Sequence, residues 1–342
     1  MKLCKPFALC VLAWICAPAW ADKSDVVILK NGDKLTGEIE KLEAGLLEFS
    51  TDTMGTVHIE WRFIAQVISS TSQVVETIDG RRLLGSLKKP ESGDAFIISS
   101  ARGPVSVDPE QAVAVWPVAA TLVDRMDLDV GLGIDYAKAT DITDLNLSSD
   151  FHLLTTDRLT EASLRIDVTR QSGDDEDEQK RTEVRVSHQY LLAKQRFRAY
   201  FAGAEGNEAL GVDLRLYAGA GLGKYFVKTN NRWLTLAAGL VATQENPEQE
   251  NSETNIEGVG NVRFRYFRYA DPERNFDTSL SVYPSLTNSG RWRADLRSTF
   301  KLEFIDDLYW SLEAYATHDS DPLTEGAETT DYGITSAVGY SF

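Results

Sequence analysis

The chain has 342 residues, of which 25% are charged and 43% hydrophobic, and its formal net charge is −17 at pH 7. Because this acidic balance lacks the excess of Lys and Arg that neutralises phosphates, we exclude nucleic acid as a partner. No segment beyond residue 21 has the roughly 18 uninterrupted apolar residues of a membrane helix. Hydropathy alone therefore indicates an acidic soluble protein.

The first 21 residues have the pattern of a secretory signal peptide. Lys2 and Lys5 precede an apolar run over 7–17, and the tripeptide Ala-Trp-Ala at 19–21 is a small-x-small cleavage site. The apolar run is well short of the ~20 residues that cross a bilayer, which favours a cleaved peptide over a membrane anchor. We expect export of the chain, with cleavage after Ala21.

All three cysteines, Cys4, Cys10 and Cys16, lie inside this peptide. The exported chain would therefore have no disulfide, no thiolate metal site and no cysteine nucleophile. Without disulfides it needs a sizeable core or a closed sheet to be stable, and about 320 residues are enough for either.

Residues 22–118 contain an internal repeat that divides them into 22–70 and 71–118. The stretch VVILKNGDKLTGEI (26–39) recurs 48 residues later as VVETIDGRRLLGSL (74–87). Three pairs of glycines keep the same spacing, namely Gly32 and Gly80, Gly37 and Gly85, and Gly55 and Gly103. A fixed period of this kind predicts two copies of one supersecondary unit.

Each copy has the pattern of short strands joined by tight turns. Asn-Gly and Asp-Gly between alternating apolar runs are strong hairpin signals, because type I′ turns need positive φ. The pattern resembles the SH3-like or Sm-like small barrels, and it predicts either a pair of bent barrels or one fused β-domain. Sm proteins bind RNA, but this segment is acidic and exported. We expect a periplasmic interaction or spacer domain, whose partner would be a periplasmic protein or peptidoglycan.

From Met126 to the end, apolar and polar residues alternate in segments separated by turn-like stretches. The twelve segments are 126–136, 143–154, 159–169, 180–191, 197–206, 212–227, 233–245, 254–269, 275–284, 292–304, 308–318 and 331–342. In 292–304, for example, the even positions are mostly apolar and most of the odd positions are charged. A period of two predicts β-strands with one apolar and one polar face.

Two architectures fit this alternation: a soluble β-sandwich, and a transmembrane barrel with its apolar side chains outside. Short connections such as 155–158 and 193–196 alternate with longer acidic ones at 171–180, 246–254 and 319–330, as on the two rims of a barrel. Several segments are longer than the usual strand of a soluble sheet. Aromatic residues near strand ends suggest interfacial girdles; they are Tyr190, Tyr225, Trp233, Tyr283, Trp292, Trp310, Tyr340 and Phe342.

These observations favour the barrel. We predict an all-β chain in which a twelve-stranded antiparallel transmembrane β-barrel over 123–342 follows a small periplasmic β-domain of two 48-residue repeats.

Several stretches resemble a known bacterial family. GVDLRLYAGAGLGKYF (211–226), WLTLAAGLVATQEN (233–246), DLYWSLEAYATHDSDPL (307–323) and DYGITSAVGYSF (331–342) are similar to proteins described as salt-induced outer-membrane proteins, a domain of unknown function. The resemblance covers about 123–342, and 22–118 is similar to a module found ahead of that barrel. It implies an outer-membrane location and a link to salt or osmotic stress. It supplies no catalytic residues.

Charged side chains on the polar parity of the predicted strands would face the interior of the barrel. These lumen-lining candidates are Arg165, Asp167, Glu183, Arg185, Arg263, Arg265, Arg293, Asp295, Arg297, Lys301, Glu303 and Glu313. Mixed charges can line a polar channel, or they can pair with one another and fill it. Twelve strands leave a narrow lumen, and the sequence leaves both interpretations open.

An enzyme of the outer membrane would need a Ser–His pair oriented by a third polar group. The chain has four histidines, His58, His152, His188 and His318, and His318 adjoins Asp319 and Ser320. No two histidines share a predicted site, and no nucleophile motif accompanies them. We therefore predict no catalytic residue.

The acidic run at 174–178 could attract divalent cations through its carboxylates. It lacks the spaced ligands and the glycine of a calcium loop, and charge runs are usually solvated. We predict no bound metal ion and no cofactor.

The chain ends on a strand-like alternation. Val338, Tyr340 and Phe342 share one parity, and together they resemble the terminal signal read by the barrel-assembly machinery. Because a closed barrel leaves no backbone group unpaired in lipid, we expect this segment to pair with the strand near 126–136.

The sequence thus predicts an outer-membrane protein with an envelope-structural or narrow-channel role. Its partners would be outer-membrane lipid, lipopolysaccharide and the barrel-assembly machinery. The alternatives are a soluble periplasmic binding protein and an outer-membrane lipid hydrolase.

Overall fold

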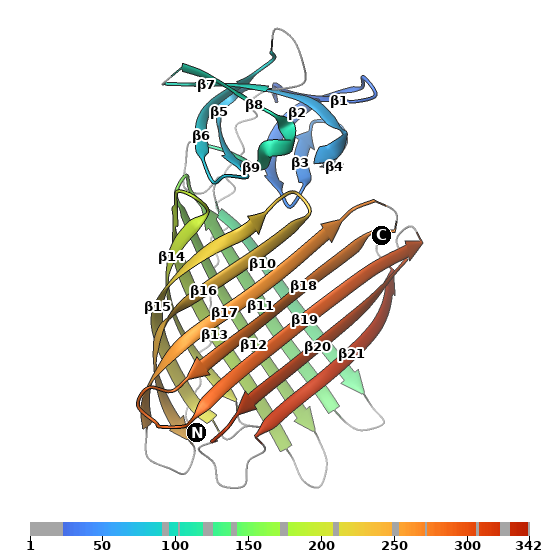
Figure 1. Ribbon diagram of the computed structural model, residues 1–342. Helices are drawn as coiled ribbons and strands as arrows, with labels where there is room; N and C mark the ends of the chain where they lie inside the picture. The colour runs from blue at the N-terminus through green and yellow to red at the C-terminus, as the bar shows by residue number, and fades with distance from the viewer. Residues whose placement is uncertain are drawn as a thin grey trace, which may run out of the picture.

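The structure is a computed structural model. It describes residues 23–90, 96–101, 103–118, 126–137, 142–171, 177–207, 212–247, 253–270, 272–305, 308–321 and 329–340. Within these residues the chain forms two β-sheets, one of nine strands and one of twelve (Figure 1). The prediction of an all-β chain with a large antiparallel sheet is confirmed. The predicted signal peptide lies outside the described residues.

None of the helices in the described ranges is long and apolar enough to cross a membrane.

The nine-stranded sheet occupies the N-terminal part of the chain. Its strands are β1 (Asp25–Leu29), β2 (Lys34–Glu43), β3 (Leu46–Thr51), β4 (Gly55–Glu60), β5 (Ile64–Thr77), β6 (Arg82–Lys88), β7 (Phe96–Ser100), β8 (Gly103–Val107) and β9 (Ala112–Pro117). Two 3-10 turns, η1 (Trp61–Phe63) and η2 (Pro109–Gln111), precede β5 and β9. The strand order is β4-β3-β2-β1-β5-β6-β7-β8, and β9 pairs with β2 and β5.

Elements of this sheet recur at the spacing of the sequence repeat. The strands β2 and β6, the strands β4 and β8, and the turns η1 and η2 each begin 48 residues apart. The turn glycines Gly32 and Gly80 both have positive φ, +95° and +77°. The long strand β5 joins the two halves, since its first part pairs with β1 and its second part with β6 and β9.

One continuous apolar core fills this sheet. The buried cluster includes Val27, Phe49 and Trp61 from the first half and Phe96 and Val115 from the second. The indole of Trp61 crosses between the halves and donates a hydrogen bond to the carbonyl of Pro109 at 2.6 Å. Because the core is shared, the structure favours one fused domain over a pair of separate barrels.

The twelve-stranded sheet follows, and each strand pairs antiparallel with the next. Its strands are β10 (Met126–Ala137), β11 (Ile142–Leu154), β12 (Arg158–Gln171), β13 (Asp177–Leu192), β14 (Arg196–Asn207), β15 (Val212–Lys228), β16 (Arg232–Pro247), β17 (Glu253–Arg268), β18 (Arg274–Pro284), β19 (Trp292–Ile305), β20 (Leu308–Asp319) and β21 (Thr330–Tyr340). The sheet curls round, so that β17–β21 pass in front of β10–β13 (Figure 1).

The twelve-stranded sheet exposes apolar side chains and buries polar ones, which is the reverse of the arrangement in an ordinary protein core. Leu128, Leu222 and Leu240 are 63%, 67% and 57% exposed, whereas Thr243 and Glu257 on the opposite face are 2% and 0% exposed. Such alternation turns one apolar face outward and gathers polar groups on the concave side.

Close contacts between aromatic rings and glycines shape the concave face. In five directly paired positions a ring lies over a glycine of the next strand; the pairs are Phe197–Gly223, Phe201–Gly219, Tyr217–Gly203, Tyr309–Gly339 and Tyr315–Gly333. A Cβ added at Gly219 would overlap the Phe201 ring. Glycine is therefore required where the ring lies flat on the neighbouring strand.

The two rims of the sheet differ. The turns at 155–157, 193–195, 229–231 and 269–273 lie on the rim that carries the N-terminal domain, which we call the proximal rim (Figure 1). The strands β10, β12, β14, β16, β18 and β20 end at the opposite, distal rim, which carries the described connection 285–291. Much of the three acidic connections on this rim lies outside the described residues.

The last strand, β21, pairs with β20 along its whole length. In the part of the chain that the structure describes, no pairing joins β21 to β10. Closure of the sheet into a barrel therefore stays a prediction.

Candidate functional site

The predicted lumen-lining positions all fall on the concave, polar face of the twelve-stranded sheet. Direct cross-strand partners share a face, and the register pairs Arg165 with Glu183 and Arg265 with Asp277. The same ladders connect the other candidates on β12, β13, β17, β19 and β20. The side chain of Asp167 lies outside the described residues.

At mid-height these charges pair locally. Arg165 binds Asp150 at 3.3 Å, and Arg263 makes a bidentate contact with Asp277 at 2.6 and 3.0 Å. Both guanidinium groups remain about half exposed. Exposed pairs of this kind contribute at most about 1 kcal/mol.

The remaining candidates make separate contacts and do not form one cluster. Arg185 bonds Glu183 at 2.5 Å and the Tyr217 hydroxyl at 3.1 Å. The ammonium group of Lys301 lies 4.1 Å from the centre of the Tyr309 ring. Asp295, Arg297, Glu303 and Glu313 share the polar face through the register of β19 and β20, and no single cluster unites them.

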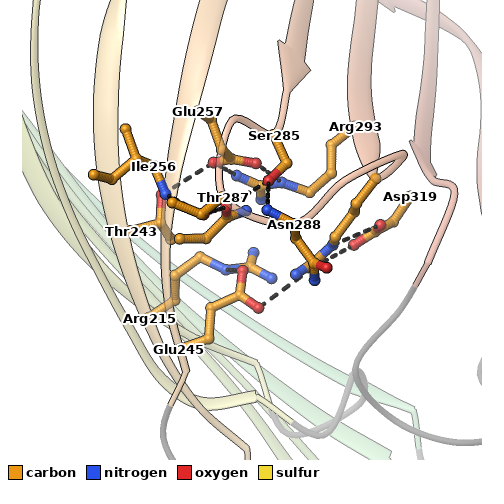
Figure 2. A network of polar contacts seen from close by, with 12 residues as sticks. Arg215, Thr243, Glu245, Ile256, Glu257, Ser285, Thr287, Asn288, Arg293 and Asp319 are labelled. Atoms are coloured by element: carbon orange, nitrogen blue, oxygen red, sulfur yellow. Dashed lines mark hydrogen bonds and ion pairs between the residues drawn. The ribbon is translucent and has the colours of Figure 1, made fainter.

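The densest polar cluster lies near the distal rim, and Arg293 is its one member among the predicted lumen-lining residues. We call it the distal network; it comprises Glu205, Arg215, Thr243, Glu245, Asn255, Glu257, Arg291, Arg293 and Asp319 (Figure 2). Figure 2 shows most of these side chains converging from several strands onto the concave side.

Two arginines of β15 and β19 make the tightest pairs of the network. Arg293 binds both carboxylate oxygens of Glu257 at 2.6 and 2.9 Å, and the Thr243 hydroxyl donates to the same carboxylate at 3.1 Å. Arg215 lies between Glu205 and Glu245, bonding Glu245 at 2.8 Å. Glu257 is fully buried, so its charge depends on these partners.

The connection Ser285–Arg291 folds against the network and covers it. Ser285 forms a β-bridge with Glu257, and the amide of Leu286 donates to the carbonyl of Ile256 at 2.7 Å. The hydroxyl groups of Ser285 and Thr287 both donate to the side-chain amide oxygen of Asn255, at 2.6 and 2.5 Å. The loop thus continues the pairing of β17 beyond the end of β18.

Arg291, the last residue of this loop, connects strands that are not neighbours. Its guanidinium group binds both oxygens of Asp319 on β20, at 2.7 and 3.1 Å, and reaches Glu245 on β16 at 3.4 Å. In the sheet, β17 and β18 lie between β16 and the start of β19. The contact with Glu245 therefore joins the start of β19 to a strand that is not its neighbour in the sheet.

Arg291 is only 4% exposed. Burial alone would lower the pKa of Arg291, but the hydrogen bonds with Asp319 and the charge of Glu245 outweigh it and raise the pKa. The cation is thereby fixed in a buried position.

The proximal end of the concave face carries aromatic rings instead of ion pairs. Phe197, Tyr225, Trp233 and Phe267 form a chain of edge and tilted contacts with centroid separations of 5.5–6.1 Å. Trp233 is also flanked by the cations of Lys228 and Arg265.

This arrangement corrects part of the predicted interfacial girdle. Trp233 and Tyr225 face the concave side, as does Tyr283 beneath Arg293. Trp292 and Trp310 do lie on the apolar face, with Leu296 and Leu302. Proximity to a strand end was a poor guide, because the parity of each residue decides its face.

The N-terminal domain docks directly on the proximal rim. Glu76 binds Lys228 at 3.0 Å, Asn230 donates to the carbonyl of Ala112 at 2.9 Å, and Gln195 donates to the carbonyl of Thr77 at 3.2 Å. Leu154 packs on a small apolar cluster that includes Trp116.

A crevice of about 1200 Å³ lies along this junction, between η1 and the 229–231 and 266–270 segments. In the adjoining turn, burial and the nearby Glu303 raise the pKa of Glu273. Burial and the charge of Glu273 raise the pKa of Tyr269 to about 12.

The histidine and its neighbours singled out in the sequence are each engaged elsewhere. His318 Nδ1 lies 2.8 Å from the Thr330 hydroxyl, and its ring makes a tilted contact with Trp292 at a centroid separation of 4.5 Å. Asp319 binds Arg291 instead of the imidazole, and the Ser320 hydroxyl accepts a hydrogen bond from the Trp292 amide at 2.9 Å. These three residues do not form a catalytic triad.

The other predicted features lie partly outside the description. Val338 is 67% exposed on the apolar face, whereas Phe342 and the side chain of Tyr340 lie outside the described residues, as does most of the acidic run 174–178. No group of three or more His, Cys, Asp or Glu could hold a metal ion in the ranges that are described.

Comparison with known proteins identifies the family of the chain. No curated protein matches it. A family model described as protein of unknown function, DUF481, matches residues 130–342, which is nearly all of the twelve-stranded sheet and more than half of the chain. The chain therefore belongs to the family described as protein of unknown function, DUF481.

Proposed function

We propose that the chain is an outer-membrane β-barrel with an envelope-structural role and a narrow, largely ion-paired interior. In this proposal β10 and β21 close the twelve-stranded sheet, and the distal rim faces the outside of the cell. The N-terminal domain, a tandem of SH3-like or Sm-like repeats, remains in the periplasm.

The observation that carries this proposal is the reversed polarity of the large sheet. Leu128, Leu222 and Leu240 turn outward, and charged side chains occupy the concave face. In water the apolar face would be a large exposed patch of the kind that drives association. In a bilayer it is the surface that the lipid requires.

The same observation weighs against the soluble periplasmic alternative. A β-sandwich would cover its apolar face with a second sheet. The nine-stranded sheet has its own core, and its contacts with the large sheet among the described residues, such as those of Gln195 and Asn230, lie at the proximal rim.

The interior supports a structural role with at most a narrow passage. Local ion pairs occupy the mid-height of the concave face, and the distal network and the aromatic cluster occupy its two ends. Outer-membrane lipid, lipopolysaccharide and the barrel-assembly machinery would be the partners of the barrel. A periplasmic protein or peptidoglycan would be the partner of the N-terminal domain.

We propose no catalysis, metal ion, cofactor or nucleic-acid partner. The link to salt or osmotic stress rests on the resemblance of the sequence alone. The half-exposed pairs Arg165–Asp150 and Arg263–Asp277 would be screened by salt, whereas the buried distal network would be screened much less.

The test is to refold a chain beginning at residue 22 into detergent micelles and lipid vesicles. We expect heat-modifiable migration on gels and strand-rich circular dichroism that persists in vesicles. In planar bilayers we expect rare, small conductance steps. A chain that stays soluble and monomeric without detergent would contradict the proposal, and lipid hydrolysis by the refolded protein would contradict the absence of catalysis.

A further inference from the structure

We propose that the distal network is the selectivity site of a gated passage for small cations, and that Arg291 is the residue that holds the gate shut. This inference rests on the proposed function, because it requires a barrel with a narrow interior. It assigns a solute class and a closing residue, which the proposed function does not.

The gate itself is the loop Ser285–Arg291. It is attached along β17 by the Glu257–Ser285 bridge and by hydrogen bonds of Ser285 and Thr287 to Asn255. A backbone hydrogen bond from the Ser285 amide to the Arg291 carbonyl, at 2.9 Å, closes the loop on itself. The side chain of Arg291 then joins the closed loop to β16 and β20. The attachment along β17 acts as the hinge, and the Arg291 side chain acts as the latch.

The latch can open without unfolding the sheet. Arg291 lies outside the strands, and its contacts with Glu245 and Asp319 are side-chain contacts that cross the concave side. The backbone pairing between β16 and β17 and between β19 and β20 does not depend on them. Loss of the latch would free the loop and leave the ladder intact.

The network contains the most buried charged side chains of the polar face. The side chains of Arg291 and Glu257 are 2% and 0% exposed, whereas those of Arg165 and Asp150, halfway along, are 50% and 52% exposed. In the proposed passage, a solute that moves along the concave face would meet its most closely packed polar side chains beside the loop.

The charge of the network determines which ions could pass. Its described members include four carboxylates, on Glu205, Glu245, Glu257 and Asp319, and three guanidinium groups, on Arg215, Arg291 and Arg293. The net charge is negative and becomes more so when Arg291 withdraws. Rings of acidic side chains at a constriction favour cations.

The experiment compares Arg291→Ala with wild type in planar bilayers under a KCl gradient. We expect the open probability of Arg291→Ala to rise at least about ten-fold, the change that about 1.4 kcal/mol produces. The reversal potential of the current should be shifted toward the equilibrium potential of K⁺. The matched control is Arg165→Ala, which removes one inward guanidinium that contacts only the neighbouring strand, at Asp150, and its conductance should stay at the wild-type level.

Three results would overturn the proposal. If Arg291→Ala migrates as a folded barrel but conducts like wild type, Arg291 is not the latch. If the current is selective for anions, the assignment of cations as the solute is wrong. If Arg291→Ala does not fold, the isosteric Asp319→Asn takes its place, and wild-type conductance of that folded variant contradicts the latch. Failure of every chain, wild type included, to form a heat-modifiable species would instead contradict the proposed function.

Discussion

The two sheets of this protein place their apolar side chains on opposite sides: one sheet buries them and the other exposes them. In the nine-stranded sheet Val27, Phe49 and Ile98 are 0% exposed and fill a shared core. In the twelve-stranded sheet leucines such as Leu128, Leu222 and Leu240 face outward, and the buried charged side chains include Glu257 and, in the adjoining loop, Arg291. Both sheets follow the same period of two, so alternation alone cannot tell which face is the inside.

What separates the two cases is the medium that each sheet requires. A sheet that buries its apolar face is stable in water by the hydrophobic effect. A sheet that exposes leucine is not stabilised in water by the hydrophobic effect. The ion pairs that it buries must also offset the desolvation of their charges by close pairing. The junction at the proximal rim is where these two arrangements meet.

The largest expected effect is the destabilisation of the nine-stranded sheet alone. Phe49→Ala removes a fully buried ring from the nine-stranded sheet and should cost about 3–5 kcal/mol. Limited proteolysis of the full chain in micelles should then cut within 23–118 earlier than in wild type, while heat-modifiable migration is kept. Met54→Ala, at an exposed turn, is the control. Loss of the heat-modifiable form would show that the two sheets fold as one unit.

The twelve-stranded sheet should be destabilised by a different substitution, on its exposed apolar face. Leu240 lies near the middle of β16 on the exposed face, and an arginine there should cost about 2–4 kcal/mol in a bilayer. The matched change is Thr299→Arg on the concave face, opposite Asp277 and Glu313. Urea unfolding in vesicles should show destabilisation for Leu240→Arg alone. The reverse order would mean that the faces are assigned the wrong way round.

A smaller effect would probe the packing of the concave face. Gly219→Val places a side chain under the Phe201 ring and should cost about 1–3 kcal/mol through overpacking. At Gly260 an added Cβ meets no atom within 4 Å, so Gly260→Val serves as the control. Unfolding midpoints in vesicles measure both, and equal midpoints would argue against the ring lying on the glycine.

The smallest expected effect concerns the junction of the two sheets. Gln195 is buried, and its amide donates to the carbonyls of Thr77 and Ile78 at 3.2 and 3.3 Å. Gln195→Ala should weaken docking by about 1 kcal/mol and broaden the distances between spin labels on the two sheets. Lys194→Ala, in the same turn but exposed, should leave the distances narrow. Unchanged distances in both variants would mean that this amide does not hold the domain.

The strands and their faces were predictable because periodicity is a local property of the sequence. The same parity that gave Arg293 also places Arg215, Glu245 and Glu257 on the polar face, so these members of the distal network could have been found. Trp233 could have been placed correctly as well, since its leucine neighbours already define the opposite face.

Other features depend on the path of the chain between strands, on which periodicity carries no information. Arg291 stands in a turn-like stretch, and its partners on β16 and β20 are 46 and 28 residues away. Gln195 lies in a turn that the sequence marks only as short, and its partners belong to the other sheet. Contacts of this kind arise from tertiary packing and require the structure.

The most direct test of the reversed polarity uses single cysteines in a chain that begins at residue 22. Leu296 and Arg297 are consecutive in β19 and point to opposite faces. A spin label at each position, in protein refolded into vesicles, reports collisions with oxygen in lipid. We predict high oxygen accessibility for Leu296→Cys, which faces lipid, and low oxygen accessibility for Arg297→Cys, which faces the polar interior. Equal oxygen accessibility at both positions would contradict a lipid-facing sheet.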